Sequence, residues 1–295
     1  MTRTVDRVAV DETVHGPFRR VSFLPLDPPD GAQVSVYRLG DTLIDTGSTR
    51  VTDAVLELVR RDPPKRILLT HQHEDHIGNV RPILDAIGRI PVHAPRALLD
   101  VIVALRKVPP YRARYWGDPH PVSAEDLVPY DPGDVFEDRG GALVAVHTPG
   151  HTPPHVAFVL ETKEDVFALT GDLYASKPLD AFLEAAQDDA IRSYRLLARH
   201  GERLRMLPTH GRVRLHGAKV LSDGADWLER ESEALVALAS ELGTREPVTV
   251  ARARYGEDPM LRVSSGEMGS SVFVRSVLAP VRELPASPLP ISGCP

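Results

Sequence analysis

A cluster of potential metal ligands, HQHEDH at residues 71–76, directly follows the short apolar run KRILLT at residues 65–70. The apolar run predicts a buried strand that carries the cluster at its C-terminal end. A loop that only reverses the chain direction is more often built from Gly, Asn, Asp and Pro. Three imidazoles and two carboxylates in this position therefore indicate a fold that uses such ligands at a strand end.

Three later segments place similar side chains in similar positions. TPGHTPPH contains His151, LTGDLY contains Asp172, and LPTHG contains His210. Each lies at or just after the C-terminal end of a predicted strand. Ligand sites in open α/β sheets gather outside the carboxyl ends of the strands, so these distant residues are expected to meet at one edge.

The spacing within the first cluster predicts one metal ion bound by three histidines. His71 and His73, two residues apart on an extended segment, point to the same side and can bind the ion together with His151. Imidazole and carboxylate ligands without a thiolate suit zinc, iron or manganese, and zinc is the first expectation. The single cysteine, Cys294, lies near the end of the sequence, far from the other candidate ligands.

A second divalent ion is predicted beside the first. Asp75 and His76 follow as the chain turns, so they can face this second ion, which His210 would join. Asp172 can place one carboxylate oxygen on each ion, which would fix the two ions roughly 3.5–4 Å apart. A coordination position shared by the two metals would remain for a water molecule.

The four motifs together resemble the metallo-β-lactamase superfamily. HxHxDH, a histidine after TPG, an aspartate in TGD and a histidine in PTHG occur in the right order over roughly residues 20 to 215. The resemblance implies an αββα sandwich with the site along one edge of the two sheets. It also implies that Asp45, in DTG, supports the metal loop without binding metal. Because Asp172 replaces the cysteine of a large subclass of true β-lactamases, the chain looks more like the glyoxalase II and lactonase branches.

The remaining pattern predicts an α/β layered protein. Strands are predicted at residues 19–26, 32–40, 41–47, 65–70, 90–94, 141–148, 155–161, 166–172 and 203–210. Helices are predicted at residues 51–61, 79–88, 95–108, 187–200 and 224–242, followed by two more short helices. The Pro-rich and aromatic stretch 111–134 shows no clear period, and we expect it to run over the surface as part of a substrate wall.

Two regions are predicted along the chain. Residues 1–216 would form the catalytic domain, and residues 217–295 a helical C-terminal region. The latter loosely resembles the small winged-helix-like appendage of some superfamily members. Its Pro-rich end, from about residue 280, is expected to fray.

The predicted activity is hydrolysis of a small ester, thioester or lactone by a hydroxide that bridges the two metals. Asp75 would orient this hydroxide or accept its proton, and a metal or Tyr174 would assist the leaving group. An equal alternative for Tyr174 is an aromatic side chain that only packs in the apolar core. Lys177 and Trp116 are candidate substrate-binding residues, whereas Glu74, at the variable position of the motif, is expected to face solvent.

Two other activities remain open: a phosphodiesterase or nuclease that uses the same metal pair, and an oxidoreductase like the mono-iron persulfide dioxygenases. The net charge of −6 and pI near 6.1 show no electrostatic footprint for nucleic acid. No signal peptide and no transmembrane-length apolar stretch is recognisable. We therefore expect a cytoplasmic enzyme with a small-molecule substrate and without a membrane or nucleic-acid partner.

Overall fold

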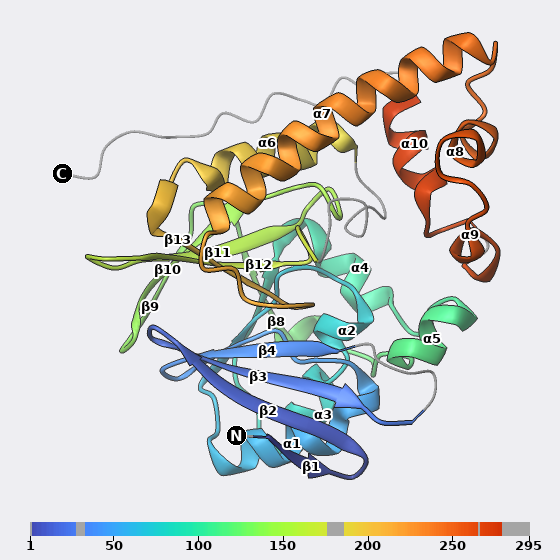
Figure 1. Cartoon of the computed structure of the whole chain (residues 1–295). Helices are drawn as coiled ribbons and strands as arrows, with labels where there is room; N and C mark the ends of the chain where they lie inside the picture. The colour runs from blue at the N-terminus through green and yellow to red at the C-terminus, as the bar shows by residue number, and fades with distance from the viewer. Residues whose placement is uncertain (1, 28–32, 176–185, 265, 279–295) are drawn as a thin grey trace.

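The computed structural model describes residues 2–27, 33–175, 186–264 and 266–278. Within these residues the chain forms two β-sheets with helices on their outer faces (Figure 1). The predicted α/β sandwich is therefore confirmed. Lys177, Cys294 and the Pro-rich end from about residue 280 lie outside the described residues.

The first sheet contains eight strands, which lie side by side in chain order. The strands are β1 (Thr2–Val5), β2 (Val8–His15), β3 (Phe18–Pro25), β4 (Val34–Leu39), β5 (Thr42–Ile44), β6 (Arg66–Leu68), β7 (Val92–Pro95) and β8 (Leu127–Tyr130). The pairs from β1 to β5 are antiparallel, and those from β5 to β8 are parallel. The parallel part requires helical crossovers, which place helices on the outer face of this sheet.

The second sheet contains five strands in the order β13-β12-β11-β10-β9. The strands are β9 (Val135–Asp138), β10 (Gly141–His147), β11 (Val156–Glu161), β12 (Val166–Gly171) and β13 (Leu204–Pro208). Only β12 and β13 pair in parallel, so their carboxyl ends lie at the same edge. Every residue of β12 is buried, as expected for a strand covered on both faces.

Three apolar clusters separate the layers. One joins Ile67 of β6 to Leu58 on the helix below the first sheet. The second joins Leu39 of β4 to Phe158 of β11, between the two sheets. The third contains Leu228 together with residues of β12 and β13. The order of layers is thus helix, sheet, sheet, helix.

The helices are α1 (Thr52–Arg61), α2 (Glu74–Ile77), α3 (Val80–Ile87), α4 (Leu99–Ala104), α5 (Pro110–Trp116), α6 (Gln187–Ala198), α7 (Gly217–Glu241), α8 (Pro247–Tyr255), α9 (Pro259–Val263) and α10 (Ser270–Leu278). Short 3₁₀ turns occupy Thr49–Val51, Arg96–Leu98, Ala124–Asp126 and Gly201–Arg203. Helix α7 crosses the second sheet beside α6, and α8, α9 and α10 gather near its far end (Figure 1). The C-terminal region is helical as predicted, with no strand among its described residues.

Several expected elements differ from the observed ones. The hairpin β1–β2 was not predicted, and the helix expected at 95–108 is the 3₁₀ turn Arg96–Leu98 followed by the six-residue α4. The stretch 111–134, expected to lack regular structure, contains most of α5 and all of β8. Helix α7 begins at Gly217, earlier than the predicted residue 224. None of the helices in the described residues combines the length and apolarity that a bilayer crossing needs.

Candidate metal centre

The first predicted ligand group assembles in the structure. Candidate ligand atoms of His71, His73 and His151 all lie within 4.8 Å of one another, and all three side chains are buried. The Nδ1 atom of His73 lies 3.1 Å from Nε2 of His71 and 2.9 Å from Nε2 of His151. Three ring nitrogens that converge on one point are suited to share a cation.

The second predicted group assembles beside the first. Candidate ligand atoms of Asp75, His76, Asp172 and His210 also lie within 4.8 Å of one another. His210 Nε2 is 2.9 Å from Asp75 Oδ2, and His76 Nε2 is 3.2 Å from Asp172 Oδ1. The set is therefore two imidazoles and two carboxylates, without sulfur.

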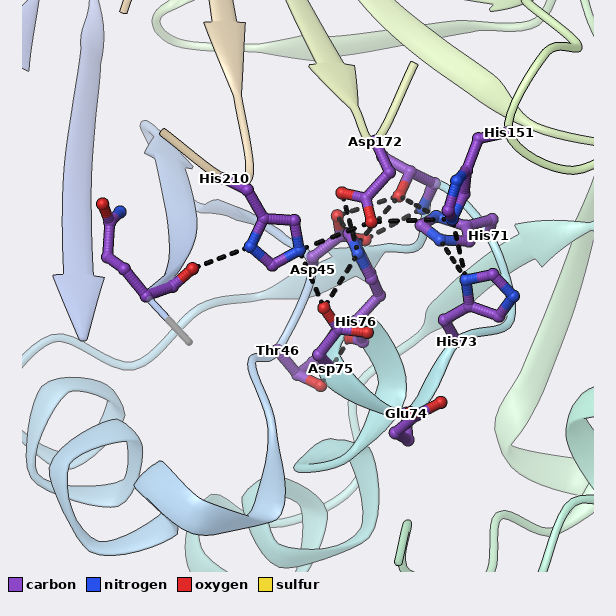
Figure 2. Close-up of polar contacts among 12 residues, drawn as sticks. Asp45, Thr46, His71, His73, Glu74, Asp75, His76, His151, Asp172 and His210 are labelled. Atoms are coloured by element: carbon purple, nitrogen blue, oxygen red, sulfur yellow. Dashed lines mark hydrogen bonds and ion pairs between the residues drawn. The ribbon is translucent and has the colours of Figure 1, made fainter. Parts of the chain in front are cut away.

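Asp172 faces both groups. Its Oδ2 atom lies 3.6 Å from His151 Nε2, in the first group, and 3.4 Å from His210 Nε2, in the second. Its Oδ1 atom faces His76. Figure 2 shows this carboxylate between His210 on one side and the three-histidine group on the other. This is the placement expected of a carboxylate shared by two ions.

Local secondary structure explains how neighbouring residues reach different groups. The chain is extended at His73, which is the N-cap of α2, and becomes helical from Glu74. His73 is therefore on extended backbone, whereas Asp75 and His76 leave the first turn of a helix and point elsewhere. The change in backbone periodicity at residue 74 separates the two groups.

The residues from the second sheet follow strand ends. Asp172 comes directly after β12, and His210 follows β13. Gly171 has a φ of +49°, which turns the chain at the end of β12. A Cβ atom there would lie 2.6 Å from Nε2 of His155, so this close approach also requires glycine.

Asp45 holds His76 from behind. Asp45 Oδ1 accepts the backbone N–H of Thr70 at 2.9 Å, and Oδ2 accepts the Thr70 hydroxyl at 2.9 Å. Its Oδ2 atom is also 2.8 Å from Nδ1 of His76. This contact favours the tautomer with the proton on Nδ1, which leaves the Nε2 lone pair for the site. The supporting role implied by the resemblance fits these contacts.

Two further imidazoles are oriented by backbone groups. His210 Nδ1 donates to the carbonyl of Gln33 at 2.7 Å, so its Nε2 faces the acidic group. His155 Nε2 accepts the backbone N–H of Asp172 at 3.3 Å, and its Nδ1 lies 3.1 Å from the carbonyl of Thr148. Burial lowers the pKa of His155 to about 3, so this ring is neutral. His155 therefore contacts the backbone of Asp172 at the end of β12.

The two groups differ in their electrostatics. Burial lowers the pKa of His71 and of His73 well below the usual value. Burial also opposes the charged form of His210, but the carboxylates of Asp172 and Asp75 raise its pKa to about 10. The pKa of His76 is raised well above its usual value by Asp172, Asp75 and Asp45, against the effect of burial. The second group is thus strongly attractive to positive charge.

The structure places the other candidate residues as follows. The ring of Trp116 lies beside that of His210, with centroids 5.2 Å apart and an interplanar angle of 37°. Tyr174 is buried next to Tyr194, with ring centroids 5.7 Å apart, in the apolar cluster under α7. A catalytic role for Tyr174 and a substrate-binding role for Trp116 stay predictions, while Lys177 lies outside the described residues.

The expectation that Glu74 faces solvent is wrong. Glu74 is fully buried, and its carboxylate binds the guanidinium of Arg112 through two hydrogen bonds. The position looked variable because only its neighbours in the motif are ligands. No sequence pattern links residue 74 to residue 112, so Arg112 was missed.

Comparisons with known proteins agree with this geometry. A family model described as "Metallo-beta-lactamase superfamily" matches residues 29–221. An uncharacterized Bacillus subtilis protein, YobT, is 30% identical over 178 residues, or 53% of this chain and 72% of that protein. An atrochrysone carboxyl ACP thioesterase of Aspergillus novofumigatus is 31% identical over 184 residues, or 61% of this chain and 48% of its own length. A hydroxyacylglutathione hydrolase of Xylella fastidiosa is 33% identical over 96 residues, or 32% of this chain and 28% of that enzyme.

Solved structures show the same architecture. A beta-lactamase domain protein from Burkholderia ambifaria matches with a TM-score of 0.70 at 14% identity, covering 91% of this chain and 88% of that one. A metallo-beta-lactamase family protein from Thermus thermophilus matches with a TM-score of 0.64 at 22% identity, covering 90% and 94%. At these identities the likeness concerns the fold alone. The chain spans about half the length or less of the thioesterase and the hydroxyacylglutathione hydrolase named above.

Proposed function

This chain belongs to the metallo-beta-lactamase superfamily, and from that premise we propose that it is a hydrolase that binds two divalent ions and cleaves a small ester, thioester or lactone. The observation that carries the proposal is the position of Asp172. Its carboxylate reaches both ligand groups: Oδ2 lies near His151 of the first group and His210 of the second, and Oδ1 faces His76 of the second. A mono-iron oxidoreductase would need only one such group.

The donor set fits a pair of ions. His76 Nε2 and Asp172 Oδ1 are both buried and lie 3.2 Å apart, but without the geometry of a regular hydrogen bond. An unpaired polar atom in a buried site costs free energy, about 1–3 kcal/mol, unless a ligand satisfies it. A shared cation would satisfy both atoms. Nitrogen and oxygen donors without sulfur suit zinc, iron or manganese, with zinc the first expectation.

The roles of the ligands follow from the two groups. His71, His73 and His151 would hold one ion. The other ion would be held by Asp75, His76 and His210, with Asp172 reaching both.

When bound, such a pair of ions lowers the pKa of water from 15.7 toward about 7 and polarises a carbonyl oxygen. Asp75 would act both as a metal ligand and as a group that handles the attacking water, because its carboxylate is buried among the ligands. It orients the attacking water and holds the proton that the water releases. Trp116, whose ring lies beside that of His210, would contact the acyl part of a substrate. Tyr174 is retained as the candidate proton donor to the leaving group.

Thioesters are our first expectation for the substrate class, because fungal relatives of this chain are named thioesterases and a bacterial relative hydroxyacylglutathione hydrolase. A phosphodiesterase activity remains the second candidate, since the same pair of ions could serve it. The net charge of −6 offers no support for a nucleic-acid substrate.

The proposal is tested by metal analysis together with a substrate panel. We expect about two equivalents of metal per chain, as in two-metal hydrolases, and turnover of a thioester or lactone. In Asp172→Ala, metal content should fall to one equivalent or less and turnover should be lost. Asp53→Ala, an exposed change on α1, serves as the control. One iron with oxygen consumption, or turnover of bis-nitrophenyl phosphate alone, would contradict the proposal.

A further inference from the structure

Helix α5 lies beside the metal centre, and the ligand set does not account for its contacts. It follows α4 in the stretch between β7 and β8 and lies on the same side of the molecule as α2 (Figure 1). Pro110 starts the helix, and Gly117, with a φ of +79°, ends it. Seven residues are too few for a helix to be stable by itself, so tertiary contacts must hold it.

The first contact joins α5 to the ligand segment. Arg112 Nε donates to Glu74 Oε1 at 2.8 Å, and a second guanidinium nitrogen bonds Oε2. The side chain of Glu74 is 1% exposed and that of Arg112 is 14% exposed. Glu74 stands between His73 and Asp75, one member of each ligand group. The pair therefore fixes α5 to the backbone that carries both groups.

The second contact is one helical turn further along. Residues four apart on a helix share a face, so Trp116 points to the same side as Arg112. Its ring lies beside that of His210, and its carbonyl accepts the Thr49 hydroxyl at 3.1 Å. Helix α5 thus runs from the first ligand segment of the chain to the last ligand.

The third contact comes from the C-terminal region. Tyr111 is buried, and its hydroxyl donates to Glu267, between α9 and α10, at 2.7 Å. The neighbouring Arg112 is bound on the other side by Glu74. The short helix is therefore held between the metal centre and the C-terminal helices.

We propose that α5 is the wall of the substrate site and that Arg112, through its buried pair with Glu74, is the positioning residue that sets where Trp116 stands and hence which acyl groups fit. This inference rests on the proposed hydrolase function. Glu74 and Arg112 belong to neither of the two ligand groups. A bidentate guanidinium–carboxylate pair fixes orientation as well as distance, which suits this role.

The first test observes the wall without using activity. The chain has two tryptophans, and Trp227 packs on Phe273 with ring centroids 5.9 Å apart. In a Trp227→Phe background, Trp116 fluorescence reports on α5 alone. Arg112→Met should raise acrylamide quenching of Trp116, whereas Arg114→Met, an exposed change on the same helix, should leave it unchanged. Equal quenching in the two variants would overturn the inference.

The second test measures selectivity on acetyl and octanoyl thioesters of N-acetylcysteamine. Arg112→Met should change the octanoyl-to-acetyl ratio of kcat/KM by about tenfold, mainly through KM, since displaced apolar contacts act on binding. Metal content should stay as in the wild type. Arg114→Met should keep the wild-type ratio.

The double variant Glu74→Gln with Arg112→Met leaves no unpaired buried charge, and it replaces the single variant if that fails to fold. If the ratio is unchanged in the variant used, the inference is wrong. If the wild type hydrolyses neither thioester, thioester hydrolysis is wrong instead, and the fluorescence result still decides the docking of α5.

Discussion

At the scale of single residues, the candidate ligands could be predicted because each occurs in a recognisable short context after a strand. The seven side chains meet in two groups, as their order predicted. The contacts around them could not be predicted to the same extent. Glu74 was expected at the surface. The partner of His210 is the backbone carbonyl of Gln33, and because every residue has such a carbonyl, no sequence pattern predicts this contact. Such partners depend on which segments, distant in the sequence, the fold brings close to the site.

Asp45→Asn should weaken metal binding by about 10–100-fold, the usual effect of losing a group that orients a ligand. One carboxylate oxygen now accepts the Thr70 amide, while the other serves the Thr70 hydroxyl and His76 Nδ1. An amide has a single acceptor oxygen, so it cannot serve both sides. Competition with a chelating dye would measure the affinity. Asp53→Asn is the control, and unchanged affinity in Asp45→Asn would remove this role.

His93 should make the fold less stable in mild acid. Burial, with Arg66 nearby, lowers the pKa of His93 below 6.5. As the pH falls below 6.5, the unfolded chain binds a proton that the folded chain does not, so stability is lost in that direction and is fully present above it. The drop in Tm between pH 7.5 and pH 5.5 should therefore be smaller in His93→Gln than in the wild type. An equal or larger drop would show that His93 does not contribute.

At the scale of elements, strands and helices with a strong apolar pattern could be predicted. Elements with an unusual turn or a proline could not. The parallel strands other than β8 were located from apolar runs, as were the helices α1, α3 and α6. The hairpin β1–β2 was missed because its turn residues, Asp6 and Arg7, both have positive φ without a glycine to indicate it. Strand β8 contains Pro129, which argues against a strand, but β8 is the last strand of its sheet, where proline is tolerated.

Replacing Arg7 by glycine should stabilise the protein. Arg7 has a φ of +62°, a left-handed conformation that costs an L-residue roughly 1–2 kcal/mol. Its ion pair with Asp27 is exposed and contributes little. Glycine also increases the entropy of the unfolded chain, so the net gain should be about 0.5–1 kcal/mol. Urea denaturation would measure it. Arg7→Ala removes the same side chain without relieving the strain and should show no gain.

At the scale of the whole molecule, the layer order and the helical C-terminal region were predicted, whereas the way they join was not. The division after residue 216 stays a prediction. Leu221 and Leu228 of α7 lie in the same apolar cluster as Val166 and Met206 of the second sheet. Helix α7 therefore provides part of the outer layer of the sandwich. A sequence shows that a helix is amphipathic, but not which distant sheet its apolar face covers.

Leu228→Ala should therefore destabilise the whole fold rather than the C-terminal region alone. Leu228 is fully buried, and the cavity should cost about 2–5 kcal/mol. Leu242→Ala, just past the end of α7, removes a side chain that is 43% exposed and should cost less than about 0.5 kcal/mol. In a Trp227→Phe background, denaturation followed by both circular dichroism and Trp116 fluorescence would compare the regions. A loss confined to one signal would argue for independent units.

The ligands come from both halves of the sandwich: His71, His73, Asp75 and His76 follow a strand of the first sheet, while Asp172 and His210 follow strands of the second. Ions bound there would cross-link the two sheets at the edge where they meet. The metal centre would then also hold the two halves of the sandwich together. Any change that increased the distance between the sheets to admit a bulkier substrate would weaken the binding of the ions. New specificities should therefore arise more readily in the surrounding loops and α5 than in the spacing of the sheets.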